Sequence, residues 1–247
     1  MEQKKIYFAS DLHLGFPDYK KSRHRERLFV EWLTQIQPTA KALYLLGDVF
    51  DFWFEYKRAV PRGFTRFLGA LSAFYDAGIE VHLFTGNHDM WIFDYLPEET
   101  GIILHREPFE TDLMGKRFYM AHGDGLGHGD KGYKILKSIF ASRISQWLFA
   151  RIHPNLGIKI ANSWSVSSRN SHEEPAFQGN DKEWLILHSK KLEETKHADY
   201  YVYGHRHVPM NIALNAHSRV VNLGDWVDHF TFAEFDGTDM KLKTYQS

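Results

Sequence analysis

Aspartate, histidine and asparagine residues gather in five short clusters that could together bind and activate a ligand. Asp11 and His13 are separated by one residue, and His205 and His207 repeat this spacing near the other end of the chain. Three further clusters lie between these pairs: Gly47-Asp48-Val49-Phe50-Asp51, Gly86-Asn87-His88-Asp89 and His122-Gly123-Asp124. Carboxylate and amide oxygens combined with imidazole nitrogens suit Mn, Fe, Co, Ni or Zn better than Ca or Mg, which prefer oxygen alone. The residue types therefore indicate a transition-metal site.

Each cluster follows a short apolar run that is typical of a buried β-strand. These runs are residues 6–9, 42–46, 81–84, 117–121 and 200–203. In open α/β sheets the loops at the carboxyl ends of the strands form the ligand crevice, so we expect the five clusters to meet at one edge. Residues two apart in an extended segment point to the same side, so Asp11 and His13 can bind one ion together or two neighbouring ions. The order of strands and clusters thus predicts a single site.

Taken one at a time, these motifs also have ordinary structural explanations. An Asp-x-His triplet occurs often by chance, a Gly-Asp pair after a strand is usually a turn, and Gly-Asn-His-Asp can form an Asn-based turn with a capping Asp. The conjunction favours function, because all five motifs stand at strand ends and all are built from metal-ligand residues. Histidines outside the motifs need no functional role.

Helical patterns separate the first strands, and a block of helices interrupts the second half of the chain. Apolar residues recur at helical spacing over residues 26–33 and 64–75. Residues 132–197 predict one helix after another, with a polar loop at 167–180. Strands return at residues 210–214, 219–223, 230–235 and 240–245. We expect one α/β domain spanning residues 1–247 with a helical cap inserted at 130–197, since a domain holds roughly 100–200 residues.

The composition excludes several classes of protein. Its 43% hydrophobic and 15% aromatic residues are too many for a natively unfolded chain. Lys and Arg number 30 against 31 Asp and Glu, a net charge of -1, which gives no sign of a nucleic-acid binder. The absence of Cys excludes disulfides, Cys-bound zinc, iron–sulfur clusters and a thiol nucleophile. With no signal-peptide core and no run of about 18 apolar residues, we expect a cytoplasmic location rather than export or a membrane span.

In this order, the motifs DLH, GDVFD, GNHD, HGD and GHRH resemble those of the calcineurin-like metallophosphoesterase superfamily, across residues 11–207. The resemblance implies a four-layer α/β/β/α sandwich with two divalent transition-metal ions, manganese first, with iron, cobalt or zinc as alternatives. By motif, it implies that the first ion binds Asp11, His13 and His207, that Asp48 bridges, and that Asn87, His122 and His205 bind the second. It also implies a catalytic His88 beside the leaving group, oriented by Asp51. Two metals about 3.5–4 Å apart can activate a hydroxide for attack on phosphorus.

The segments SDLHLG, LYLLGDVFDFW, HGDGLGHGDKGY and IANSWSVSSRN are similar to those of a narrower family, the UDP-2,3-diacylglucosamine diphosphatases of lipid A synthesis. That family carries a helical cap at the same place. The similarity implies hydrolysis of the pyrophosphate of a UDP-linked diacylated sugar to UMP and 2,3-diacylglucosamine 1-phosphate, with peripheral contact at the cytoplasmic face of the inner membrane. The substrate contacts it implies are Asn87, His88, Asp130, Tyr133, Ser163, Ser167 and Arg169. It implies no nucleic-acid partner, and it leaves the oligomeric state open.

Two positions depart from the narrower family, which commonly has Arg where this chain has His88 and Glu where it has Asp51. They leave open a second hypothesis, in which a phosphodiesterase or phosphatase of the same superfamily acts on another nucleotide or phosphoester. A third hypothesis, from a different class, is an inactive interaction module. Such a module would be expected to lose metal ligands, whereas all seven are present here. Apolar cap residues such as Phe140 and Trp147 suit an acyl channel or a membrane surface, although apolar residues at helical spacing are more often core.

Overall fold

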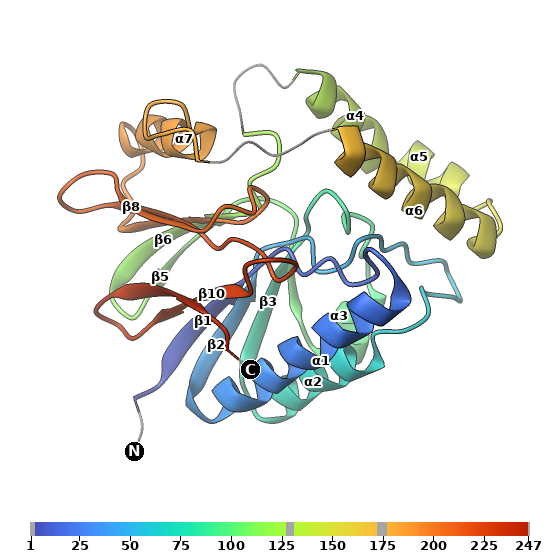
Figure 1. The fold of residues 1–247 in the computed structure, drawn as a ribbon, viewed down its shortest axis with the longest axis horizontal. Helices are drawn as coiled ribbons and strands as arrows, with labels where there is room; N and C mark the ends of the chain where they lie inside the picture. The colour runs from blue at the N-terminus through green and yellow to red at the C-terminus, as the bar shows by residue number, and fades with distance from the viewer. Residues whose placement is uncertain (1–2, 127–130, 172–176, 247) are drawn as a thin grey trace.

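The computed structural model describes residues 3–126, 131–171 and 177–246, in which two β-sheets are stacked between helices (Figure 1). The six-stranded sheet has the order β11-β10-β1-β2-β3-β4. Its strands are β1 (Lys5–Ala9), β2 (Ala40–Leu45), β3 (Glu80–Phe84), β4 (Ile103–His105), β10 (Thr231–Phe235) and β11 (Met240–Thr244). The five-stranded sheet has the order β5-β6-β7-β9-β8. Its strands are β5 (Phe109–Leu113), β6 (Lys116–Ala121), β7 (Tyr200–Tyr203), β8 (Met210–Ala213) and β9 (Arg219–Asn222).

Helices cover the outer face of each sheet. The six-stranded sheet carries α1 (Tyr19–Ile36), which continues into the short 3-10 helix η1 (Gln37–Thr39), together with α2 (Thr65–Asp76) and α3 (Tyr95–Thr100). The five-stranded sheet carries α7 (Trp184–Glu193), whose Leu185 and Ile186 are buried with residues of β6 and β7. The layers therefore run helix, sheet, sheet, helix, as expected for an α/β/β/α sandwich.

The alternation of side chains along β1 explains why the two sheets stack. Ile6 and Phe8 face the second sheet, where the Phe8 ring stacks on Phe118 with centroids 5.7 Å apart. Tyr7 points the other way and meets the edge of Trp32 on α1 at 6.2 Å. Because successive residues of a strand point to opposite faces, one continuous apolar run fills two layers of core.

The remaining helices form a separate group above the edge of the sandwich (Figure 1). They are α4 (Lys131–Ala141), α5 (Arg143–Phe149) and α6 (Pro154–Ser171). The structure thus divides the segment predicted as a single cap at 130–197, because α7 is an outer layer of the sandwich. Its buried Leu185 and Ile186 give it a hydrophobic face that packs on the second sheet. We use "cap" below for α4–α6 alone.

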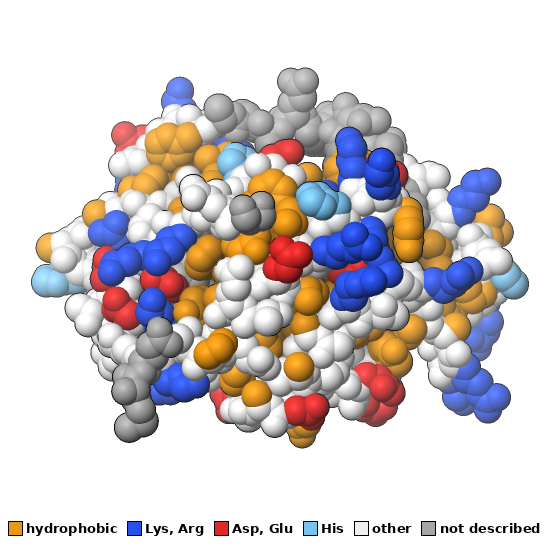
Figure 2. Space-filling model, turned by 60° about the horizontal axis from the view of Figure 1, so that its bottom comes forward, with side chains coloured by type: hydrophobic (Ala, Val, Ile, Leu, Met, Phe, Trp, Pro, Cys, Tyr) orange, Lys and Arg blue, Asp and Glu red, His pale blue; other side chains and the backbone are white. Residues whose placement is uncertain are grey.

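Within the described ranges, no helix has both the length and the apolarity needed to cross a membrane. Figure 2 shows acidic and basic side chains interspersed on one face of the molecule, with hydrophobic side chains between them. This mixture agrees with the net charge of -1.

Candidate metal centre

Parallel strand pairing brings the five polar clusters to one edge of the sandwich. β1 pairs in parallel with β2, and β2 with β3, in the first sheet, while β6 pairs in parallel with β7 in the second. Each cluster begins one or two residues after its strand ends. The carboxyl ends of these strands therefore carry all the candidate ligands to one place, as the sequence predicts.

Asp11, His13 and His207 form the first group of ligand atoms, all within 4.8 Å of one another. His207 Nε2 lies 3.2 Å from Asp11 Oδ1 and 3.1 Å from His13 Nε2. Asp11 Oδ1 is buried and receives no hydrogen bond from the residues that the structure describes. A buried carboxylate oxygen facing two imidazole nitrogens is a suitable place for a cation.

Asp48, His122 and His205 form the second group, also within 4.8 Å. His122 Nε2 lies 3.3 Å from Asp48 Oδ2 and 3.3 Å from Asn87 Oδ1. The same Asp48 oxygen is 3.9 Å from His13 Nε2 of the first group. Asp48 therefore stands between the two groups, where a bridging ligand is expected.

The backbone of five of these residues adopts the left-handed conformation. Its φ angles are +55° at Asp11, +44° at His13, +50° at Asp48, +65° at His205 and +52° at His207. This region is uncommon for residues other than glycine, and such strain is found preferentially at functional sites. These residues are also those whose ligand atoms gather at the site.

Two glycines let neighbouring loops approach the ligands closely. A β-carbon at Gly86 would lie 2.1 Å from Asp48 Oδ1, and one at Gly204 would lie 2.6 Å from Asp11 Oδ2. Because these positions carry no side chain, backbone amides of the same loops come close enough to donate hydrogen bonds that fix the carboxylates. The amide of His88 donates to Asp48 Oδ1 at 2.9 Å, and the amide of His205 donates to Asp11 Oδ2 at 2.9 Å.

The electrostatics of the site favour positive charge among the carboxylates. Burial opposes ionisation of Asp48, but His122 and His88 outweigh it and hold the pKa of Asp48 well below its usual range. Burial also disfavours the charged form of His122, yet Asp48 raises the pKa of His122 to about 10. Burial and the neighbouring His122 lower the pKa of His205 to about 4. The buried Asp48 carboxylate and the His122 imidazole therefore stabilise each other's charged forms, so the negative charge of Asp48 favours a cation at this place.

The predicted catalytic pair, His88 and Asp51, also lies at this edge, but the contact differs from the expected one. His88 Nδ1 donates to the backbone carbonyl of Asp51 at 2.9 Å, whereas the nearer carboxylate oxygen, Oδ1, is 3.8 Å away. Asp51 Oδ2 instead accepts a 2.9 Å hydrogen bond from Ser165 Oγ on α6. The backbone of Asp51 therefore orients the imidazole, and the cap orients the carboxylate.

The substrate contacts predicted on the cap have different outcomes. Ser163 is exposed, and its hydroxyl donates to the carbonyl of Lys159 rather than to the metal centre. Two residues on, Ser165 faces the site, because residues two apart lie on opposite sides of a helix. Tyr133 lies in α4, and Ser167 and Arg169 in α6, with side chains outside the described set, while Asp130 lies outside the described residues.

Three buried residues, Asp89, Arg25 and Trp226, support the ligand loops, and of these only Arg25 was not anticipated from the sequence. Asp89 accepts hydrogen bonds from the amides of Gly86, Val49 and Phe50, which ties the loop after β3 to the loop after β2. Burial and the nearby Asp48 raise the pKa of Asp89 to about 7.

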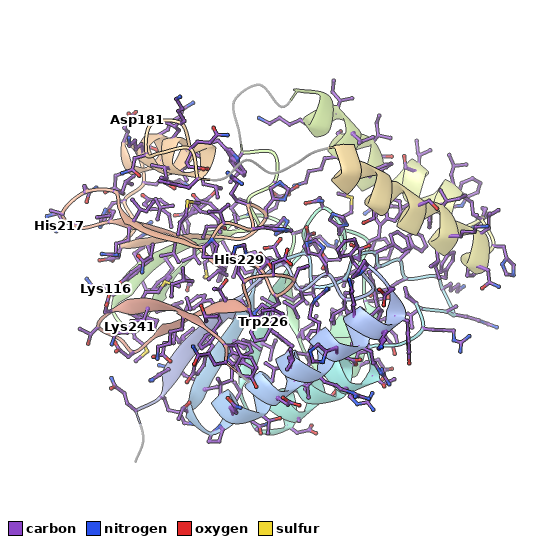
Figure 3. The ribbon with its side chains drawn as sticks, viewed as in Figure 1. Lys116, Asp181, His217, Trp226, His229 and Lys241 are labelled. Carbon is purple, nitrogen blue, oxygen red and sulfur yellow. The ribbon has the colours of Figure 1, made fainter. Side chains whose placement is uncertain are left out.

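The other two act on the loop after β1. Arg25 of α1 donates to the carbonyls of Leu12 and His13 at 2.9 and 2.8 Å. The amide of Trp226, labelled in Figure 3, donates to the carbonyl of Asp11 at 3.1 Å. Trp226 follows the strand predicted at 219–223, as the ligand motifs follow theirs, and this position indicates that it lies near the site. The contact of Arg25 has no such signal in the sequence.

An apolar cavity of about 320 Å³ opens beside the metal centre. Asp51, Asn87 and His88 lie at its polar end, and the rest of its lining is mostly apolar, including Trp91, Phe140, Phe149, Ile152 and Ile160. Aromatic contacts dock the cap over it, since the Phe149 ring lies 4.7 Å from those of Phe54 and Trp91. The Trp91 indole also donates to the carbonyl of Phe140 at 2.9 Å. The cavity therefore lies between the cap and the loops that carry the catalytic pair.

Comparison with known proteins identifies the class to which this site belongs. Residues 4–209 match the family model of the calcineurin-like phosphoesterases, and the chain belongs to that family. Its relatives include the UDP-2,3-diacylglucosamine hydrolase of Porphyromonas gingivalis, which is 39% identical over 99% of this chain and 98% of its own length. The UDP-2,3-diacylglucosamine hydrolase of Pasteurella multocida is 27% identical over 94% of both chains. Both the superfamily resemblance and the narrower one are confirmed.

Among solved structures, the protein TT1561 of Thermus thermophilus is 13% identical, with a TM-score of 0.50 and coverage of 98% of this chain and 99% of that chain. At this level of identity the comparison concerns the fold alone.

Proposed function

We propose that this chain hydrolyses the pyrophosphate bond of UDP-2,3-diacylglucosamine to UMP and 2,3-diacylglucosamine 1-phosphate. The observation that carries the proposal is the apolar cavity whose polar end is formed by Asn87 and His88. A substrate with acyl chains on one side of its phosphates needs an apolar space directly beside a phosphoesterase centre. The names of the two relatives cited above support the same substrate.

Two divalent cations fit the two groups of ligand atoms. The first would be held by Asp11, His13 and His207, and the second by Asn87, His122 and His205, with Asp48 shared. The donor set of carboxylates, an amide and imidazoles without sulfur suits manganese, and also iron, cobalt or zinc. When bound, such a pair supplies an activated water and neutralises the charge that develops on the attacked phosphorus.

His88 stabilises the negative charge that develops on the leaving phosphate. In its protonated form the imidazole donates from both nitrogens, and Nδ1 is already engaged by the Asp51 carbonyl. The proton on Nε2 is then the one donated in a hydrogen bond to the departing oxygen of the sugar 1-phosphate. The hydrogen bond from Ser165 fixes the neighbouring Asp51 carboxylate, so the cap contributes to the position of the imidazole. Asn87, beside His88 at the mouth of the apolar cavity, contacts the same phosphate.

The direct test is hydrolysis of UDP-2,3-diacylglucosamine in detergent by the full chain loaded with Mn²⁺, with UMP release followed over time. We expect release that stops when the metal is chelated and that is lost in Asp48→Ala with the fold retained by circular dichroism. If this substrate stays intact while bis-p-nitrophenyl phosphate is hydrolysed rapidly, the natural substrate is another phosphoester. Unchanged hydrolysis by Asp48→Ala would contradict the dimetal mechanism.

The proposal extends to contact between the cap and the cytoplasmic face of the inner membrane, where a diacylated substrate resides. Residues 131–171 contain seven Lys and Arg but no Asp or Glu. The cap exposes large apolar side chains beside these cations, namely Ile135, Ile139, Ile144, Trp147, Leu148 and Leu156. Apolar side chains that enter the lipid boundary, with cations that meet anionic headgroups at about 1 kcal/mol each, favour such a surface.

Co-sedimentation with vesicles tests this contact. We expect the protein to bind vesicles containing phosphatidylglycerol and to bind phosphatidylcholine alone much more weakly. Trp147→Ala should reduce binding, whereas Tyr75→Ala, which removes a similarly exposed aromatic ring from α2, should not. Equal binding by both variants would argue against the cap as the contact surface.

A further inference from the structure

A second cavity, of about 520 Å³, lies between the cap and α7. It shares no lining residue with the apolar cavity. Gly125 and Leu126, which follow the His122 cluster, line it from the loop after β6, and Lys134 lines it from α4. The α7 side provides Trp184, whose ring centroid is 6.0 Å from that of His205 in the second ligand group. The cavity therefore lies beside the second ligand group, from which it is separated by the Trp184 ring.

The lining of this second cavity is basic and aromatic. Lys134, Lys182 and Lys191 line it, and none of their ammonium groups forms an ion pair within the described ranges. Glu194 is the acidic residue among the lining side chains. By contrast, the nearby Lys190 pairs with Asp181 at 3.3 Å and is not in the lining. Three cations around one space, with no carboxylate partner among the described residues, favour an anionic ligand.

We infer that this second cavity binds the nucleotide half of the substrate, with the base against Trp184 and the ribose and phosphate near the three lysines. The inference rests on the proposed function, in which the pyrophosphate lies on the metal centre between two unlike halves. The apolar cavity suits the acyl chains, so the nucleotide needs a separate space with an aromatic face and positive charge. A volume of about 520 Å³ falls within the range of roughly 300–1,000 Å³ typical of small-molecule sites.

Trp184 and the lysines play separable parts in this site. An aromatic face recognises the base, and its removal weakens nucleotide binding by about 5- to 150-fold, the equivalent of one stacking interaction. The lysines act as point charges on phosphate, so they contribute equally to ligands with and without a base. The two parts can therefore be told apart with two probes, UMP and ribose 5-phosphate.

The experiment measures binding of both probes to the Mn²⁺-loaded full chain by calorimetry. We expect Trp184→Ala to weaken UMP within that range and to leave ribose 5-phosphate nearly unchanged, with Trp184→Phe restoring much of the loss. The double variant Lys182→Ala/Lys191→Ala should weaken both probes. Lys190→Ala, the matched control on the same helix, should weaken neither. Equal loss of both probes in Trp184→Ala, or no loss of UMP, would overturn the inference.

The same variants separate this inference from the proposed function, because binding of UMP does not require turnover. If UDP-2,3-diacylglucosamine is hydrolysed and the Trp184 variants keep the wild-type KM, the nucleotide site is elsewhere. If Trp184 governs UMP binding but that substrate stays intact, the nucleotide site stands and the lipid half of the proposed substrate is wrong.

Discussion

Ser165→Ala tests whether the cap holds the catalytic pair in place. The hydroxyl is buried, donates to Asp51 Oδ2 at 2.9 Å and lies 3.5 Å from His88 Nδ1. A hydrogen bond to a charged group contributes about 1.5–3 kcal/mol. If that energy is lost in the transition state, kcat falls by about 10- to 150-fold, since each 1.36 kcal/mol is a factor of ten. Ser165→Thr keeps the hydroxyl and should keep most of the rate.

The assay compares two leaving groups. With UDP-2,3-diacylglucosamine the negative charge that develops on the departing phosphate stays on its oxygens and is stabilised by His88, so the loss in kcat should be at its largest. With an activated p-nitrophenyl ester the ring delocalises the charge of the leaving group, and the loss should be several-fold smaller. Ser145→Ala makes the same chemical change on α5, where the hydroxyl accepts a hydrogen bond from Ser142. Equal losses on both substrates, or wild-type kcat in Ser165→Ala, would refute the positioning role.

Three further outcomes are expected. Gly86→Ala should lower the bound metal measured by mass spectrometry after dialysis, because the new β-carbon would lie 2.1 Å from Asp48 Oδ1 and must displace that carboxylate; full metal content would contradict this. Phe149→Ala should loosen the cap by about 1–2 kcal/mol, which corresponds to roughly 5- to 30-fold faster limited proteolysis within α4–α6; an unchanged cleavage rate would mean that other contacts hold the cap. Burial lowers the pKa of His82 and that of His105, the latter to about 4, so both favour the neutral form in the folded state. The stability contributed by these two neutral histidines should therefore be complete above about pH 6.5 and be lost as pH falls toward 4. His105→Gln should make the midpoint of urea unfolding less dependent on pH over that interval. An equally steep dependence would exclude His105 as a cause.

Much of the fold was predictable because the central strands, such as β1, β2 and β7, are buried on both faces. The apolar run predicted at 81–84 is β3 (Glu80–Phe84), and the cluster that follows it lies where parallel pairing places it. Helix boundaries were harder. The helix predicted at 26–33 begins at Tyr19, where Asp18 caps it through a hydrogen bond from the Lys21 amide. Its first turns are polar even where they are buried, at Ser22 and Arg25, so they carry no hydrophobic period.

The candidate site was predictable in its residue types but less so in its supporting contacts. Asp11 and Asp48 could be placed together from the sequence because each follows a strand, and the two strands are parallel neighbours whose carboxyl ends meet at one edge. Ser165 was hidden because the rotation of α6 about its axis decides which serine faces the site, and its neighbours Ser163 and Ser167 are equally plausible by sequence. Arg25 was not predictable because its partners are backbone carbonyls 13 and 12 residues earlier, and a carbonyl carries no signal in the sequence. Long-range packing, not local pattern, selects such residues.

The left-handed backbone at the candidate ligands also limits which metals the site can come to prefer through mutation. Among residues with a β-carbon, Asn, Asp and His tolerate this conformation best. Positions 11, 13, 48, 205 and 207 hold only Asp and His. A change of ligand to Glu or Cys would add backbone strain to the altered coordination, whereas exchanges among Asp, Asn and His would not. The backbone conformation thus restricts these positions to Asp, Asn and His. Through mutation, metal preference can therefore change only among ions that bind carboxylate or amide oxygens and imidazole nitrogens.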